Sequence, residues 1–215
     1  MTAVSSDTEA IRLKIMFPTL LGEAAYPDYG TIKDRLVARI DQLSREDSEG
    51  IEISRQRYPH GYTSFYTQNA LHRDPVFAEL TQFLQQQAER YASGQSWDMQ
   101  RFVPVMSSMW CSINRRNSSH GQHLHPFSHI SGVFYVSCQS DSGSIYFKDP
   151  RQGRWMVPPP LAQNLPENTL NIRIDPLEGN LLLFPSFLEH GVEQNNTDSN
   201  RYSISFNFEI QPRRP

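Results

Sequence analysis

The front part of the chain carries apolar residues at the spacing of an α-helix. Ile32, Leu36, Ile40 and Leu43 recur at intervals of four, four and three residues. This spacing places the four side chains on one face of a helix and leaves the other face polar. The pattern therefore predicts an amphipathic helix over residues 31–45 whose role is to support the core.

A second helix is predicted to begin at residue 75. Asp74 followed by Pro75 is a favourable helix start, because the carboxylate caps the free N–H groups and proline suits the first helical position. The residues that follow supply an apolar stripe made of Val76, Phe77, Leu80, Phe83 and Leu84. We expect this helix to run to about Tyr91 and Gly94 to end it.

From about Phe102 onward the apolar period changes to two, as β-strands require. Short runs of β-branched and aromatic residues separated by turn residues predict strands over 103–114, 130–138, 144–148, 170–174, 180–184 and 201–209. Strands in this number behind two helices predict a mainly β protein, a double-sheet jelly roll with helices packed on one sheet. No linker or internal repeat divides the chain, so we expect a single domain over 1–215, with a helical support region at 1–100 and the jelly-roll core at 101–210.

The stretch from 150 to 169 fits neither pattern. It contains five prolines, at positions 150, 158, 159, 160 and 166, together with Arg151, Arg154 and Trp155. Irregular segments of this length are uncommon inside compact domains unless they are functional or disordered. We interpret the segment as a candidate cover for a substrate site.

Charge and hydropathy exclude two classes of function. The net charge is −3 and no long basic run occurs, which argues against nucleic-acid binding. No apolar run approaches the ~20 residues of a membrane span. Arg12 and Lys14 precede a short apolar patch, but Pro18 interrupts it, so we expect the first 21 residues to contain the first strand of the domain rather than a secretory signal.

The two cysteines, Cys111 and Cys138, lie in strand-like apolar segments. Such cysteines are usually buried free thiols, and two of them cannot form a disulfide scaffold. We therefore expect a cytoplasmic protein.

The candidate chemistry is carried by histidines. His123 and His125 are separated by one residue, so in an extended strand both imidazoles project from the same face and can share a metal ion. His190 follows much later, just past an apolar strand. A close pair on one strand and a third histidine on another is typical of a facial metal site in a β-barrel.

The last predicted strand supports a site at the same place. Alternation sends Tyr202, Ile204, Phe206 and Phe208 to one face, and sends Arg201, Ser203, Ser205 and Asn207 to the other. The first face is apolar and belongs to the core. The second face presents a guanidinium fork and a nearby hydroxyl, and that combination suits a small carboxylate.

Four ordered blocks of the chain read HLHPFSHISGVFYV, KDPR, LLFPSFLEHGV and RYSISFN. With them the sequence resembles the 2-oxoglutarate and Fe(II)-dependent oxygenases, in particular a small branch of that superfamily, over about Gly61 to Glu209. The resemblance implies a double-stranded β-helix of the cupin-like type. It also implies that His123 and His190 hold Fe(II) and that Arg201, assisted by Ser203, binds the distal carboxylate of 2-oxoglutarate.

The third metal ligand departs from the wider superfamily, which has a carboxylate two residues after the first histidine where this chain has His125. The candidates are His125, His120 and a carboxylate such as Asp149, and spacing on the strand favours His125. Three neutral imidazoles leave the site with the full +2 charge of the metal, which draws an anionic cosubstrate more strongly than a site with a carboxylate does. Asn114, Tyr135 and Tyr146 are further candidates for cavity residues, although the two tyrosines are more often packed aromatics.

The function implied by the resemblance is oxidation of an unactivated C–H bond by Fe(II), 2-oxoglutarate and O2, with release of succinate and CO2. The substrate is expected to be a small molecule or a side chain presented by another protein, and the oligomeric state, a homodimer included, stays open. Two alternatives are a three-histidine dioxygenase that does not use 2-oxoglutarate and a non-catalytic metal- or ligand-binding barrel. Arg201 with Ser203 argues against the second alternative, because a metal-binding module has no need of a carboxylate clamp.

Overall fold

The computed structural model describes residues 11–213 and consists of two antiparallel β-sheets with helices on one side. The larger sheet has the strand order β1-β8-β5-β10-β3-β2 and the smaller one the order β4-β9-β6-β7. The strands of the larger sheet are β1 (Gly22–Ala25), β2 (Gly61–Thr63), β3 (Phe102–Asn114), β5 (Ile130–Ser137), β8 (Asn180–Pro185) and β10 (Arg201–Pro212). Those of the smaller sheet are β4 (His120–His123), β6 (Ile145–Lys148), β7 (Asn171–Ile174) and β9 (His190–Val192). This arrangement is a double-stranded β-helix, so the predicted fold class is confirmed.

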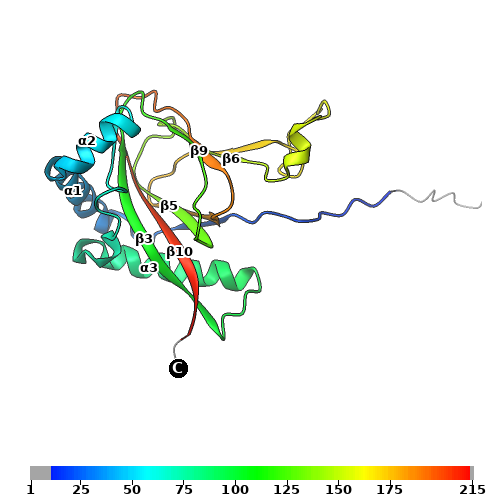
Figure 1. The fold of residues 1–215 in the computed structure, drawn as a ribbon, viewed down its shortest axis with the longest axis horizontal. Helices are drawn as coiled ribbons and strands as arrows, with labels where there is room; N and C mark the ends of the chain where they lie inside the picture. Colours follow the sequence, from blue (N-terminus) through cyan, green and yellow to red (C-terminus); the bar gives the residue numbers. More distant parts are fainter. Residues whose placement is uncertain (1–10, 214–215) are drawn as a thin grey trace, which may run out of the picture.

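The helices cover the outer face of the larger sheet. Helices α1 (Gly30–Glu46) and α3 (Ala78–Gly94) lie against the sheet that contains β3, β5 and β10, while β6 and β9 lie on its other side (Figure 1). The core between helices and sheet includes Leu36, Ile40 and Leu84 from the helices, packed with Ile204 and Phe206 of β10. The apolar face predicted for the last strand therefore meets the apolar faces predicted for the two helices.

The predicted helices are confirmed, with a different start for the second. Asp74 accepts a hydrogen bond from the N–H of Val76 at 2.9 Å, but the turn that it caps is a 3-10 turn (Pro75–Phe77), and the α-helix begins only at Ala78. A third helix, α2 (Ser48–Arg57), was not predicted. Its buried residues are Gly50 and Ser54, so it lacks the apolar stripe that identifies a helix in a sequence.

All six predicted strands occur, and the described part of the chain contains four further strands of three or four residues that were not predicted: β1, β2, β4 and β9. The expectation for the N-terminus was wrong where the structure describes it, because residues 11–21 form no strand and the first strand is β1, paired with β8. Ile11 and Leu13 are 88% and 90% exposed, so their alternation with Arg12 and Lys14 is not matched by any sheet. The part of that prediction that concerns residues 1–10 lies outside the described residues.

The two thiols are free, as expected, but only Cys111 is buried; Cys138 is half-buried at the end of β5. None of the described helices is long and apolar enough to cross a membrane.

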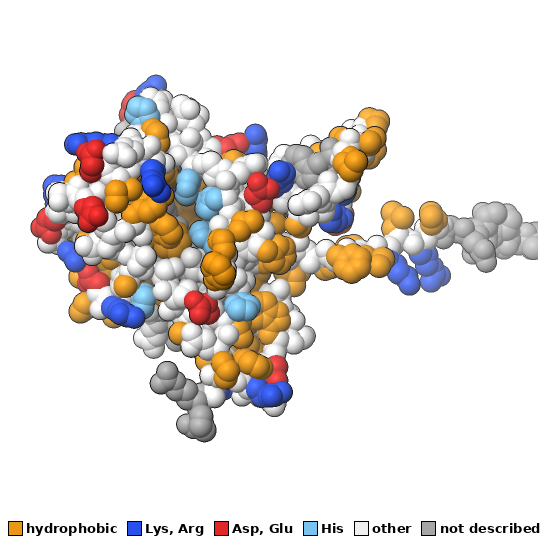
Figure 2. All heavy atoms as spheres, in the orientation of Figure 1, with side chains coloured by type: hydrophobic (Ala, Val, Ile, Leu, Met, Phe, Trp, Pro, Cys, Tyr) orange, Lys and Arg blue, Asp and Glu red, His pale blue; other side chains and the backbone are white. Residues whose placement is uncertain are grey.

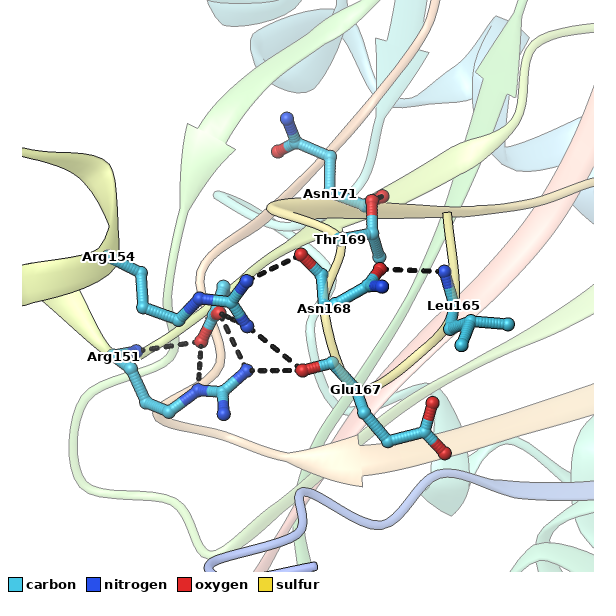
Figure 3. Close-up of polar contacts among 8 residues, drawn as sticks. Arg151, Arg154, Leu165, Glu167, Asn168, Thr169 and Asn171 are labelled. Atoms are coloured by element: carbon cyan, nitrogen blue, oxygen red, sulfur yellow. Dashed lines mark hydrogen bonds and ion pairs between the residues drawn. The ribbon is translucent and has the colours of Figure 1, made fainter. Parts of the chain in front are cut away.

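The segment between β6 and β7 projects away from the two sheets (Figure 1). Its base is held by polar contacts: Arg151 binds the Asp149 carboxylate at 2.9 and 2.8 Å, and Arg154 donates to the backbone carbonyls of Glu167 and Asn168 (Figure 3). Short 3-10 helix η3 (Gln152–Trp155) lies within it. Its role as a substrate cover stays a prediction, since in this conformation it supplies none of the described residues that line the cavity discussed below.

The helix-covered face of the larger sheet has no space for an added atom at Gly132 of β5. A Cβ at this position would lie 2.5 Å from the Phe206 ring and 2.7 Å from the carbonyl oxygen of Leu182. We expect Gly132→Ala to lower the free energy of unfolding by about 1–3 kcal/mol, because overpacking forces backbone to move. Urea denaturation checks this, with Gly153→Ala, which has open space around it, as the control; equal stability of the two variants would contradict the prediction.

Candidate functional site: four histidines and a buried arginine in one cavity

A cavity of about 370 Å³ opens between the two sheets. The polar face of β10 forms part of its wall, with Arg201, Ser203, Ser205 and Asn207 all lining it, as alternation predicts. The register pairs Arg201 with Asn114 and Ser203 with Ser112 across β3, and Ser203 with Tyr135 across β5. Asn114 and Tyr135 therefore line the cavity as expected, whereas Tyr146 does not.

Three histidines converge at one end of this cavity. The candidate ligand atoms of His123, His125 and His190 all lie within 4.8 Å of one another. His123 and His190 sit opposite each other where β4 pairs with β9. A single divalent ion can be reached from all three positions, and imidazole is a ligand that suits iron.

His125 arrives there by a different route from the one expected. Strand β4 ends at His123, so the two histidines do not share a strand face. The N–H of His125 instead donates to the Ser186 carbonyl at 3.0 Å, which ties the loop after β4 to the loop after β8. The ring of His125 lies against the rings of His190 and Trp110, with centroids 5.2 and 5.8 Å away.

Backbone carbonyls orient two of the three rings. The Nδ1 of His123 is 2.9 Å from the Gly121 carbonyl oxygen, and the Nδ1 of His190 is 2.8 Å from that of Leu188. A carbonyl can only accept, so each Nδ1 carries the proton and each Nε2 offers its lone pair. This is the tautomer that a metal ligand needs.

The rings are neutral as well as oriented. Burial, with a smaller effect from the neighbouring imidazoles, lowers the pKa of His125 to about 3 and that of His190 to about 4; burial also lowers the pKa of His123. At neutral pH these nitrogens therefore hold no extra proton that a metal ion would have to displace. The donor set fits a divalent transition metal.

The other candidates for the third ligand lie in different surroundings. His120 lines the cavity, with its ring centroid 4.2 Å from that of His123, and it packs edge-on against Tyr58. Asp149 is bound by Arg151 and does not line the cavity. Of the remaining histidines, His129 accepts a hydrogen bond from the N–H of Ile210 at 3.2 Å, away from the cluster.

Arg201 is the second feature of the cavity. Its side chain is buried, with 3% of the residue exposed, and Nη1 donates to the carbonyl oxygens of Ser142 and Gly143 at 3.2 and 2.5 Å. Its Nε has no hydrogen-bond partner among the described residues, and no described carboxylate forms an ion pair with it. A buried cation with a free donor is costly unless an anion binds it, so the geometry fits a carboxylate ligand.

Tyr58, which sequence reasoning missed, completes the surroundings of this arginine. Its hydroxyl donates to Asn114 Oδ1 at 2.8 Å, and Asn114 in turn donates to the Ser118 hydroxyl. Burial raises the pKa of Tyr58, and the nearby Arg201 guanidinium opposes that rise. No sequence signal marks Tyr58, because it lies at the end of helix α2, far from the histidine and arginine blocks.

The same region of the chain matches a family model. Residues 108–207 match the model described as "Putative 2OG-Fe(II) oxygenase". Residues 108–207 belong to the 2OG-Fe(II) oxygenase family. The family recognised from the sequence is thereby confirmed, and with it the class of enzyme, an oxidoreductase that uses Fe(II), 2-oxoglutarate and O2.

Several solved structures have the same fold as this chain at low sequence identity. A Pseudomonas putida prolyl-4-hydroxylase is 14% identical, with a TM-score of 0.58, over 92% of this chain and 94% of that one. HygX from Streptomyces hygroscopicus, solved with nickel, 2-oxoglutarate and hygromycin B, is 14% identical, with a TM-score of 0.57, over 89% of this chain and 83% of that one. The epimerase SnoN, in complex with Fe3+, alpha ketoglutarate and nogalamycin RO, is 12% identical, with a TM-score of 0.60, over 90% of this chain and 82% of that one. No curated protein sequence matches this chain.

Proposed function

We propose that His123, His125 and His190 hold Fe(II) in this oxygenase and that Arg201, assisted by Ser203, binds the distal carboxylate of 2-oxoglutarate. The reaction is oxidation of an unactivated C–H bond in a small molecule or a presented side chain. Together with O2, bound Fe(II) and 2-oxoglutarate supply the oxidising chemistry, which releases succinate and CO2. The protein positions the reactants and limits side reactions.

The observation that carries this proposal is the buried, incompletely bonded guanidinium of Arg201 in the same cavity as the three oriented imidazoles. A metal-binding module has no use for a buried cation near its metal, because the two positive charges repel each other. A dicarboxylate resolves this repulsion, since one end can bind the metal and the other the arginine. Asn114 and Tyr135 then limit the space around the bound cosubstrate.

An anaerobic titration tests the proposal. Fe(II) and then 2-oxoglutarate are added to the metal-free protein, and chelation of the metal by 2-oxoglutarate is followed by the visible charge-transfer band that it produces. We expect a saturable band. Iron binding without a band would favour the three-histidine dioxygenase that works without 2-oxoglutarate, and absence of iron binding would favour a binding module.

The third ligand can be tested separately at position 125. We expect His125→Ala to weaken Fe(II) binding by about 100-fold or more. Loss of a residue that only hydrogen-bonds to a metal ligand already lowers metal affinity about 10–100-fold, and loss of a ligand should cost at least as much. His125→Asp should restore much of the affinity, since a carboxylate supplies both a ligand atom and a negative charge. Metal analysis after dialysis against a weak chelator measures this.

His129→Ala is the matched control for that experiment, because His129 lies outside the cavity lining. It should retain iron like the unaltered protein. Full iron content in His125→Ala would exclude His125 and turn attention to His120.

Solved structures with the same fold are compatible with either kind of substrate, a presented side chain or a small molecule. One is named a prolyl-4-hydroxylase, and another was solved with hygromycin B, a small molecule. We therefore propose that the substrate of the present chain is either a small molecule or a side chain presented by another protein. Separately, the two free thiols support a cytoplasmic location, which we also propose.

A further inference from the structure

An unbroken row of aromatic rings leads from the histidine cluster to the outside. Trp110 lies 5.8 Å from His125, Phe65 lies 5.0 Å from Trp110, and Tyr66 lies 5.1 Å from Phe65, all measured between ring centroids. The exposed fraction rises along the row, from 7% at Trp110 to 38% at Phe65 and 44% at Tyr66. All four residues line the cavity, so this row is its outer wall.

Figure 2 shows the corresponding face of the molecule, where histidine side chains gather near the centre with hydrophobic side chains beside them. Leu124, between two of the histidines, also lines the cavity and is 48% exposed. Exposed apolar side chains around a concave site mark the place where an apolar part of a ligand is bound.

Arg57 stands at the outer end of the aromatic row. It is the last residue of α2, lines the cavity, and places its guanidinium carbon 5.3 Å from the centroid of the Tyr66 ring. No described carboxylate forms an ion pair with it, whereas Arg55 on the same helix binds Glu52 at 3.1 Å. The Arg57 guanidinium is thus oriented by an aromatic face and keeps its donors for another group.

The positive charge of the cavity favours binding of a second anion, beside Arg57. Its described lining contains Arg57, Arg201 and four histidines but no aspartate or glutamate. Once Fe(II) and 2-oxoglutarate are bound, the two negative charges of the cosubstrate offset those of the metal, and the charges of both arginines remain. An anionic substrate is therefore attracted into the cavity, and a cationic one is repelled.

Resting on the proposed oxygenase function, we propose that the substrate is a small amphiphilic acid. Its anionic group binds Arg57, and its apolar body lies along Phe65 and Trp110. The order of the row places the apolar body, rather than the acid, nearest the histidines. The substrate must be small, because a cavity of about 370 Å³ is near the lower end of the range for ligand sites and also has to hold 2-oxoglutarate.

The test uses 3-phenylpropionate as the probe and 3-phenylpropan-1-ol as its neutral counterpart. Each is titrated by calorimetry, without oxygen, into the protein loaded with Fe(II) and 2-oxoglutarate, so that Arg201 is already occupied. We expect the acid to bind at least tenfold more tightly than the alcohol. Arg57→Gln should weaken binding of the acid about tenfold and leave the alcohol unchanged, since a charge-assisted hydrogen bond contributes about that much at a partly exposed site.

Matched variants test the anion position at Arg57 and the apolar contact with Trp110 separately. Arg55→Gln, on the same helix but already paired with Glu52, should change neither ligand. Trp110→Ala should weaken both ligands, whereas Phe187→Ala, which removes an exposed aromatic ring outside the cavity lining, should weaken neither. Equal binding of acid and alcohol, or an acid affinity that does not depend on Arg57, would overturn the inference.

Failure of the inference and failure of the proposed function give different results. If the charge-transfer band forms but the acid shows no Arg57-dependent binding, the oxygenase function stands and the substrate class is wrong. If no band forms, the function fails, and the acid is titrated into the metal-free protein instead. Binding that is lost in Arg57→Gln then supports the acid site, and binding that is lost only in Arg201→Ala overturns it.

Discussion

His190→Ala is expected to lose its iron and at least about 99% of its 2-oxoglutarate turnover. His190 is 4% exposed and packs against the rings of Phe147 and Phe184, with its Nδ1 hydrogen-bonded to the Leu188 carbonyl. No other described side chain on β9 can take its place, because the next residues are Gly191 and Val192. Metal content after gel filtration and succinate formation measure the two losses.

The fold should survive this change. His190 packs on Phe147 and Phe184 of the smaller apolar cluster, whereas the larger cluster lies between the helices and the larger sheet, so the circular dichroism spectrum should be unaltered and the loss of stability modest. His129→Ala controls for removal of a histidine outside the cavity. Stoichiometric iron in His190→Ala would remove this residue from the proposed site.

Arg201→Ala is expected to retain iron and to bind 2-oxoglutarate about 100-fold more weakly. A factor of 100 corresponds to about 2.7 kcal/mol, which lies within the range for hydrogen bonds from a charged group and below that for breaking a buried ion pair. The charge-transfer titration measures the affinity directly. The affinity of Arg201→Lys for 2-oxoglutarate should lie between those of the unaltered protein and of Arg201→Ala, because lysine keeps the charge but loses the planar fork that matches a carboxylate.

Arg173→Ala is the matched control for this prediction. Arg173 is an exposed arginine on β7 that pairs with Glu193, and it does not line the cavity. Its removal should leave the affinity for 2-oxoglutarate unchanged. Unaltered affinity in Arg201→Ala would show that the buried guanidinium has another task, such as binding a carboxylate of the substrate itself.

Local patterns in the sequence predicted most of the framework. Helix α1 and the alternation of β10 were predictable because an apolar stripe or an apolar face must be buried, and its period reveals the element. Helix α2 has no such stripe, and β1 and β4 contain none of the β-branched and aromatic residues that marked the equally short β6 and β7. Sequence reasoning therefore missed elements whose formation depends on neighbours supplied by the rest of the fold.

The amino-acid sequence by itself determined which side chains the candidate site contains. These are the histidine pair, the later histidine, and the arginine on the polar face of the last strand. These inferences depend on side-chain chemistry and on spacings of a few residues, which the sequence states directly. Only the tertiary structure decided that His125 joins the cluster from a loop, that Arg201 has a free donor, and that Arg57, Tyr58 and Phe65 border the same cavity. The physical reason is that these contacts join segments far apart in the chain, so they exist only after the strand register and the closure of the two sheets have placed the segments together.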